Sequence, residues 1–303
     1  MSLVLQDPLV VAPSPTPFHN DDTVDHAAIE ANVARWLETP LSGFVLNTEN
    51  GEEAFLAESE RLEIVRTVAR VAAGKTLLIG GIDNPSVTES LRIAETLVEA
   101  GAELIRVRIP RLTANVRGYF EQLVPHAPAP VIVIHQPAPG LFLSGASALG
   151  IEPELIGELV AMDGVFGYIA SADLRIEARV RLFVPETKRF WAGNGTLLLP
   201  GIVQGANGAC LMLGNVAPAE CLELFRLTAA GELAEAAALQ RRLVEADWQI
   251  LSRRAAGLKA ALELLGYQAG RPRSPQMPCS PAELEQIRAA LHRAGLIGKH
   301  GNT

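Results

Sequence analysis

Three arginines near the end of one strand-like segment have the chemistry of an anion site. Arg106 and Arg108 stand two residues apart in the run 104–109, and Arg111 follows at the end of that run. Because side chains alternate across a strand, Arg106 and Arg108 share one face, and the aliphatic residues between them share the other. If the arginine face lines a site, charge-assisted hydrogen bonds would hold a carboxylate or a phosphate there.

The same two arginines could instead belong to internal ion pairs. A buried guanidinium must be compensated, and the candidate carboxylates are those of Glu49, Glu52 and Glu103. Under this alternative the arginines form salt bridges or lie between helices, and they bind no ligand. The sequence leaves both interpretations open.

His135 and Glu49 have the side chains of a general base and its partner. His135 ends the apolar segment 130–135, and Glu49 follows the segment 43–46, so both are expected near one rim. A positioned histidine can accept a proton from a bound molecule, with the carboxylate beside it. The alternative is a hydrogen-bonded structural histidine at a strand end.

Metal chemistry is a competing possibility for these residues. An enolase-like or class II aldolase site needs clustered ligands, whereas Glu49, Glu52, His135 and Asp173 form only a loose set. The three cysteines also lack the spacing of a metal site, and their odd number indicates reduced thiols in a cytoplasm. We therefore expect no metal and no cofactor.

The turn Gly193-Asn194-Gly195-Thr196 follows another strand-like segment. Many barrels hold phosphate on backbone amides at this place. We predict that a small carboxylate or phosphate is held mainly by Arg108 or Arg111, with the backbone amides near Gly193. The candidate substrate-binding residues are accordingly Asn50, Arg108, Arg111, Gly193, Asn194 and Cys210.

The elements that must position these residues alternate between strand-like and helical segments. Eight apolar segments, nearly all followed by helices, predict parallel strands, since parallel pairing needs crossover connections. The chain has 303 residues, and (β/α)8 barrels commonly hold about 250 residues as one unit. We therefore predict a TIM (β/α)8 barrel for residues 1–228 and a three-helix extension for residues 229–303. Chemistry is then expected at the C-terminal ends of the strands.

The composition and charge limit the classes of partner. The chain is 49% hydrophobic and 20% charged, which is typical of a protein with a large core. Its net charge of −8 argues against nucleic acid and anionic membrane as partners. The N-terminal segment has neither a basic region nor a cleavage site, and no apolar run approaches the roughly 20 residues of a bilayer span. We expect a cytoplasmic protein whose ligand is a small molecule.

Several motifs resemble those of the dihydrodipicolinate synthase / N-acetylneuraminate lyase family in order and spacing. They run from about residue 9 to residue 296 and include Thr16-Pro17-Phe18, Gly51-Glu52, Gly193-Asn194 and Asn215-Val216. The resemblance implies a TIM barrel with C-terminal helices and a homo-oligomer, a dimer or a tetramer, to which the apolar segment 141–143 could contribute. It also implies pyruvate-dependent aldolase chemistry, in which a lysine of the sixth strand forms a Schiff base with pyruvate.

The positions that carry this chemistry in the family differ in this chain. Ile169 stands where the resemblance places the lysine, and an isoleucine cannot form an imine. Glu49 and Asn50 replace two threonines, Ile134 replaces a tyrosine, and Pro139 replaces an arginine that binds the carboxylate of the aldehyde partner. The resemblance thus implies a lyase-family protein that binds a small oxo- or hydroxy-acid, with any remaining chemistry acid–base. The alternative is a non-catalytic binding or regulatory homologue.

None of the four lysines is expected to replace the missing one. Lys75 and Lys188 precede strands, at the end of the barrel opposite the expected site, and Lys299 lies in the terminal tail. Lys259 falls in the extension, where the resembling family often has a lysine that is not the Schiff-base residue. A nucleophilic lysine also needs a desolvated pocket that lowers its pKa.

Overall fold

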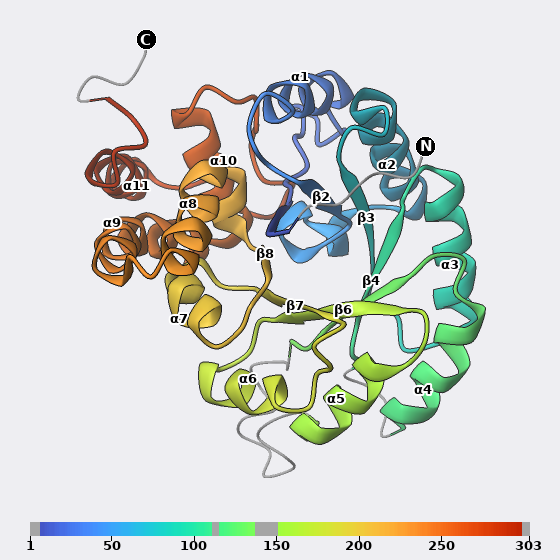
Figure 1. Ribbon diagram of the computed structural model, residues 1–303. Helices are drawn as coiled ribbons and strands as arrows, with labels where there is room; N and C mark the ends of the chain where they lie inside the picture. The colour runs from blue at the N-terminus through green and yellow to red at the C-terminus, as the bar shows by residue number, and fades with distance from the viewer. Residues whose placement is uncertain (1–6, 111–114, 137–150, 299–303) are drawn as a thin grey trace.

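Eight parallel strands close into a barrel in the computed structural model, which describes residues 7–110, 115–136 and 151–298 (Figure 1). Each strand pairs with the next, and β1 pairs with β8 to close the ring. The predicted TIM barrel is therefore confirmed. The strands are β1 (Leu9–Pro13), β2 (Gly43–Leu46), β3 (Leu77–Ile82), β4 (Leu104–Arg108), β5 (Val131–Ile134), β6 (Val165–Ala170), β7 (Arg189–Ala192) and β8 (Gly208–Cys210).

A helix follows each strand and covers the outside of the barrel. Local capping explains several of the starts, because a side-chain oxygen satisfies a free backbone N–H in the first turn. Asp25 accepts from the backbone N–H of Ala28, and Ser86 accepts from that of Glu89. The covering helices are α1 (His26–Trp36), α2 (Glu58–Ala72), α3 (Val87–Glu99), α4 (Val116–Leu123), α5 (Pro153–Ala161), α6 (Leu174–Arg181), α7 (Leu198–Val203) and α8 (Pro218–Ala229).

Three further helices form the predicted extension, and Figure 1 shows them side by side next to α7 and α8. They are α9 (Leu233–Leu251), α10 (Arg254–Leu264) and α11 (Pro281–Arg293). The predicted capping box is present at the start of α11, where Ser280 and Glu283 satisfy each other's backbone N–H groups. In the described part of the chain, no helix is both long and apolar enough to cross a bilayer.

Short 3-10 helices build much of the surface around the ends of the strands. Two of them, η1 (Glu49–Gly51) and η2 (Glu53–Phe55), follow β2. Two others, η5 (Gly195–Leu197) and η6 (Met212–Asn215), follow β7 and β8, and η3 (Val124–His126) extends α4. Among the described residues, η1, η2, η5 and η6 therefore give a defined structure to the loops that follow β2, β7 and β8.

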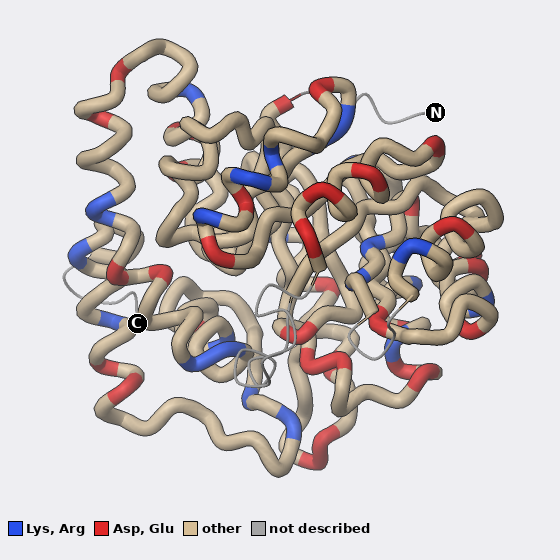
Figure 2. The backbone as a smooth tube through the Cα atoms, turned by 90° about the horizontal axis from the view of Figure 1, so that it is seen from below, with Lys and Arg blue, Asp and Glu red and all other residues tan. Residues whose placement is uncertain are grey.

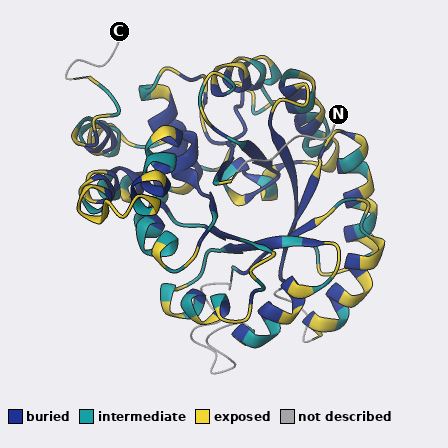
Figure 3. Cartoon of the chain, in the orientation of Figure 1, coloured by how far each residue is buried: buried dark blue, intermediate teal, exposed yellow. Residues whose placement is uncertain are grey.

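The strands of the barrel are mostly buried (Figure 3), and apolar side chains pack on both sides of the sheet. The larger cluster lies between strands and helices, and a smaller one fills the barrel interior. Strands buried on both faces are typical of parallel barrels. Acidic and basic residues are interspersed along the chain (Figure 2). The interior cluster contains Leu9, Val11, Val45, Leu77, Ile79, Leu104, Ile132, Ile134, Ile169, Trp191 and Cys210.

Candidate active site

A cavity of about 220 Å³ opens at the C-terminal ends of the strands. We call it the mouth cavity. Val45, Ile134 and Ile169 give it an apolar wall, and polar groups come from the loops above. Active sites of TIM barrels lie at this end of the strands. Of the predicted site residues, those that line the mouth cavity are Glu49, Asn50, Arg108, Gly193, Asn194 and Cys210.

The mouth cavity adjoins a wider hollow of about 710 Å³. Arg108, Gln136 and Ser171 line both spaces. Asp173, a predicted rim residue, lines only the wider hollow, where its side chain caps the start of α6. Arg111 and the segment 141–143 lie outside the described residues.

Arg106 and Arg108 face the barrel interior, which is the orientation that an anion site at this place requires. Both line the mouth cavity, and their side chains are only 3% and 4% exposed. Gly81 on β3 makes room for Arg106, because a Cβ at that position would lie 2.7 Å from its Nη2. Nη2 of Arg106 in turn donates to the backbone oxygen of Asn47 at 3.4 Å.

The two arginines are also ion-paired, but the predicted partners were wrong. Glu53 lies 3.7 Å from Nη2 of Arg106 and 3.5 Å from Nη2 of Arg108. Arg108 also pairs with Asp83. Glu49 and Glu52 pair elsewhere, and Glu103 accepts from the backbone N–H of Leu78 instead. The interior location and the ion pairs thus exist together.

The protonation of Glu53 controls the charge of this cluster. Burial raises the pKa of Glu53, and the neighbouring Arg106 and Arg108 offset only part of that increase. Burial also lowers the pKa of Arg106, against the attraction of Glu53. When Glu53 takes up a proton, the two arginines face one carboxylate among the described residues, that of Asp83, and these groups together carry a net positive charge. The arrangement can therefore accept an anion.

His135 does not reach the mouth cavity. Its neighbours Ile134 and Gln136 line the cavity, so strand alternation turns the imidazole to the other side. The residue is 3% exposed, and burial lowers its pKa to about 4, which keeps the ring neutral at pH 7. Among the described residues its Nδ1 has no hydrogen-bond partner. Its backbone oxygen accepts from Ser171 at 2.8 Å.

Glu49 lies on the rim, apart from His135. Its carboxylate is 3.4 Å from Nη1 of Arg254, and both side chains are more than half exposed. The structure therefore does not bring together the two residues proposed as base and partner. A role for His135 as the general base has no support from this geometry.

Cys210 and Asn194 line the mouth cavity in different ways. Burial raises the pKa of the Cys210 thiol to about 12, so it stays protonated and unreactive. The side-chain oxygen of Asn194 accepts from the backbone N–H and the hydroxyl of Thr196, which fixes the turn after β7. Asn194 thus shapes the wall of the cavity.

A buried ion pair links the loop after β2 to the C-terminal extension. Glu52 has a left-handed backbone with φ 61, and its carboxylate lies 2.5 Å from Nζ of Lys259 on α10. Both side chains are 1% exposed. Burial lowers the pKa of Lys259 to about 8, against the opposing effect of Glu52. Nζ of Lys259 also donates to the backbone oxygen of Arg271 at 2.8 Å.

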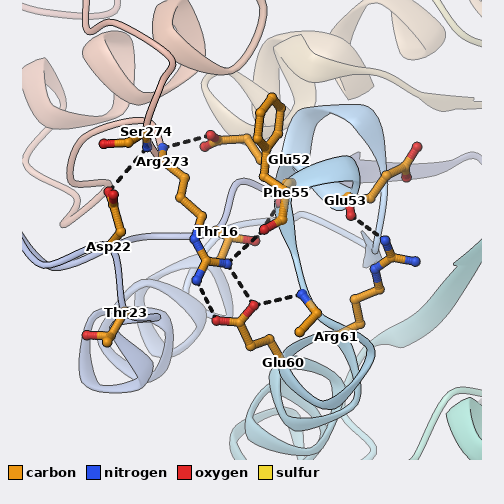
Figure 4. Close-up of polar contacts among 12 residues, drawn as sticks. Thr16, Asp22, Thr23, Glu52, Glu53, Phe55, Glu60, Arg61, Arg273 and Ser274 are labelled. Atoms are coloured by element: carbon orange, nitrogen blue, oxygen red, sulfur yellow. Dashed lines mark hydrogen bonds and ion pairs between the residues drawn. The ribbon is translucent and has the colours of Figure 1, made fainter.

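The segment between α10 and α11 adds further polar contacts to the same loop, as Figure 4 shows. The backbone N–H of Arg273 donates to Glu52 at 2.9 Å, and its guanidinium binds both oxygens of Glu60 and the backbone oxygen of Phe55. Gln276 donates to the same oxygen of Glu52 at 2.5 Å. We call these contacts, with the Glu52–Lys259 pair, the clamp. It holds the loop that carries Glu53.

No lysine lines the mouth cavity among the residues that the structure describes. Ile169 is completely buried there and pairs in register with Ile134 on β5. Lys188 donates to the backbone oxygens of Met162 and Val165, at the N-terminal end of β6. Lys75 is exposed, and Lys299 lies outside the described ranges.

The extension contributes residues to the cavity that were not predicted from the sequence. Asp247 and Leu251 of α9 and Arg254 of α10 all line the mouth cavity. A signal was present, because Asp247 falls on the same helical stripe as the apolar residues Leu243 and Ile250. A charged residue on the buried stripe of a helix is unusual and marks a candidate site. Within the described ranges, no group of three or more His, Cys, Asp or Glu residues is arranged to hold a metal.

A closed (β/α)8 barrel with a polar cavity at the C-terminal ends of its strands places the protein among TIM-barrel proteins. The chain belongs to the dihydrodipicolinate synthetase family, whose model matches residues 8–294. It is 27% identical over 288 residues to the 4-hydroxy-tetrahydrodipicolinate synthase of Archaeoglobus fulgidus, covering 93% of this chain and 96% of that protein. It is 24% identical over 284 residues to the same enzyme of an Exiguobacterium species, covering 92% and 94%.

Solved structures show the same fold. A dihydrodipicolinate synthase from Cyanidioschyzon merolae with lysine bound gives a TM-score of 0.86 at 23% identity, over 95% of this chain and 98% of that one. The prophage protein YagE of Escherichia coli K12, in complex with pyruvate, gives 0.83 at 21% identity, over 95% and 98%.

Proposed function

We propose that this protein binds a small oxo- or hydroxy-acid in the mouth cavity without forming an imine. The observation that carries the proposal is the replacement of the nucleophile in an intact cavity. Ile169 lies at the position that the family resemblance assigns to the Schiff-base lysine, and the apolar Ile134 lies beside it. The arginines and the backbone turn at Gly193 still offer groups that a carboxylate can bind.

Binding of an acid is coupled to protonation of Glu53 in this account. The guanidiniums of Arg106 and Arg108 face two carboxylates, those of Glu53 and Asp83, so their charge is balanced. The pKa of Glu53 is raised by burial, and an arriving anion raises it further through like-charge repulsion. The ligand's carboxylate and a proton therefore enter together.

Any chemistry that remains is acid–base. Glu49 is available on the rim, held near the cavity by Arg254. Its carboxylate can accept a proton from a ligand that reaches the rim, and this role stays a prediction.

The second candidate function is a non-catalytic binding or regulatory homologue. It is supported by the pairing of both interior arginines with carboxylates, since these ion pairs compensate the buried charges without any reaction. The first function would convert its ligand, whereas the second would only bind it, and both use the same ligand site.

We also propose that the chain self-associates and works in the cytoplasm. Leu182 and Val203 are large apolar side chains exposed on the outer helices, 79% and 63%, and a partner copy could cover them. One structure with the same fold is described as the first monomeric dihydrodipicolinate synthase variant, so a monomer is the alternative. All three cysteines are unpaired, in agreement with a reducing compartment.

Thermal-shift and calorimetric titration with citrate, phosphate and pyruvate test the ligand site. We expect at least one of these anions to stabilise the wild-type protein. Arg108→Ala should weaken that binding about tenfold or more, since a charged hydrogen bond contributes roughly 1.5–3 kcal/mol. Arg66→Ala, at an exposed ion pair with Glu63 on α2, is the matched control and should leave binding unchanged. If none of the three anions shifts the wild-type melting temperature, Arg108 serves only the ion pairs and the proposal fails.

A further inference from the structure

Asp247 brings a buried carboxyl group to the mouth cavity from the extension. The residue lies on α9, is 2% exposed, and lines the cavity together with Gly195 and Leu251. The packing is close, because a Cβ on Gly195 would lie only 2.6 Å from Oδ1 of Asp247. The glycine thus lets the carboxyl group approach the turn after β7.

The carboxyl group of Asp247 has few partners of its own. Thr196 donates its hydroxyl to Oδ2 at 3.0 Å, and its backbone N–H also acts on the carboxyl group. Asn194 shares both donors, because its Oδ1 lies 2.7 Å from the hydroxyl and 3.0 Å from the backbone nitrogen of Thr196, and each donor has only one hydrogen to give. Within the described part of the chain, no Lys, Arg or His lies within ion-pair distance of Asp247. The other carboxylate lining the cavity, that of Glu49, is paired with Arg254.

Buried carboxylates without a cation are costly to ionise. Burial raises the pKa of Asp247 to about 6, and the hydrogen bonds from Thr196 reverse only part of the increase. At neutral pH the group is therefore mostly ionised but under-supplied with hydrogen-bond donors. A ligand that brings a donor into the cavity would satisfy it.

The arginines stand across the mouth from this group. Arg106 and Arg108 lie on β4, whereas Asp247 packs against η5, which follows β7. In the closed ring of eight strands, β7 and β4 are separated by β5 and β6 on one side and by the remaining four strands on the other. The mouth cavity thus has a guanidinium side and a carboxylate side.

We propose that Asp247 makes the mouth cavity select acids that also carry a hydroxyl or ammonium group. This inference rests on the proposed function, the binding of a small acid in the cavity. The ligand's carboxylate binds on the side of Arg106 and Arg108, and its hydroxyl or ammonium group donates to Asp247. The preferred ligand class is therefore a hydroxy- or amino-acid, because the oxygen of an oxo-acid's carbonyl can only accept.

Calorimetric titration with two matched series of acids tests the selection. The probes are propanoate, lactate and alanine in one series, and butanoate, 4-hydroxybutanoate and 4-aminobutanoate in the other. We expect a hydroxyl or ammonium group to strengthen binding to the wild-type protein about tenfold in at least one series. Asp247→Asn should remove most of the advantage of the ammonium group, because the negative charge is gone.

Asp247→Ala, which removes the acceptor, should bring all members of a series within about twofold of each other. Asp163→Asn makes the same change as Asp247→Asn at an exposed position before β6 and should behave as wild type.

The outcomes separate this inference from the function on which it rests. If substituted and unsubstituted acids bind the wild type equally, or if the preference survives in Asp247→Ala, Asp247 does not select the ligand and the proposed function stands alone. If none of the acids in the two series binds the wild-type protein, the selection by Asp247 fails, and titration with citrate, phosphate and pyruvate shows whether the proposed function fails with it. Loss of binding for unsubstituted acids in Asp247→Ala would also contradict the inference, since those acids offer Asp247 no donor.

Discussion

Lys259→Met should lower the free energy of unfolding by about 3–5 kcal/mol, because it leaves the carboxylate of Glu52 buried without its cation. Both side chains of the pair are 1% exposed, so water cannot replace the lost partner. The same substitution removes the hydrogen bond to the backbone oxygen of Arg271 and the contact of Nζ with the ring of Phe18 at 4.5 Å. Urea unfolding followed by circular dichroism measures the change.

A double variant shows whether the stranded charge is the cause. Glu52→Gln combined with Lys259→Met removes both charges and should recover a large part of the loss, since replacing a whole buried pair is far less costly than breaking it. Lys75→Met is the matched control at an exposed lysine and should change stability by less than about 0.5 kcal/mol. Equal stability of Lys259→Met and wild type would show that the Glu52–Lys259 pair contributes nothing measurable.

Asp247→Asn should raise the free energy of unfolding at pH 7.5, by about 3 kcal/mol. Burial raises the pKa of Asp247 from 3.8 to about 6, and every tenfold change in the acid dissociation constant corresponds to about 1.4 kcal/mol. A raised carboxyl pKa means that the folded state holds its proton more tightly than the unfolded state. Ionisation therefore destabilises the folded protein as pH rises from about 4 to about 6, and the full penalty is present above that range.

The pH dependence distinguishes this cause from improved packing. The gain of Asp247→Asn should shrink as pH falls from about 6 and should be nearly absent at about pH 4, where wild-type Asp247 is protonated in the folded state. Urea unfolding of both proteins across this range measures it, with Asp163→Asn as the exposed control. A gain that is the same at every pH, or a loss at pH 7.5, would contradict the assignment.

Regular features of the sequence predicted the barrel and the face occupied by the arginines. The alternation of apolar strands and helices required parallel pairing, and the structure confirms the closed barrel. The spacing of Arg106 and Arg108 required a shared face, because side chains alternate along a strand. That this face is the interior follows from the packing of the whole barrel, which a single strand does not reveal.

The partners of these arginines depend on loop geometry that spacing does not encode. Glu52 has a left-handed backbone and directs its carboxylate to Lys259, which leaves Glu53, the next residue, to face the arginines. The prediction for His135 was also wrong by one residue position along the strand. Strand alternation gives the cavity Ile134 and Gln136, and the histidine between them faces away.

The contribution of the extension depends on contacts between distant parts of the chain. Asp247 and Arg254 reach the mouth cavity only because α9 and α10 pack beside the strand ends. Thr196 and Asp247 are 51 residues apart in sequence, and their hydrogen bond is a property of the packed structure. The signal in the sequence was the charge of Asp247 on the buried, mostly apolar stripe of α9.

Intact-mass spectrometry after incubation with pyruvate and borohydride tests the central claim, that this barrel holds its ligand without an imine. Borohydride reduces an imine to a stable amine, so a Schiff-base protein gains the mass of one reduced pyruvyl group. A family member that carries the sixth-strand lysine serves as the positive control. We expect the mass of this protein to stay unchanged, because Ile169 occupies the interior position and no lysine among the described residues lines the cavity. A pyruvyl adduct mapped to any lysine, Lys259 foremost, would contradict the claim.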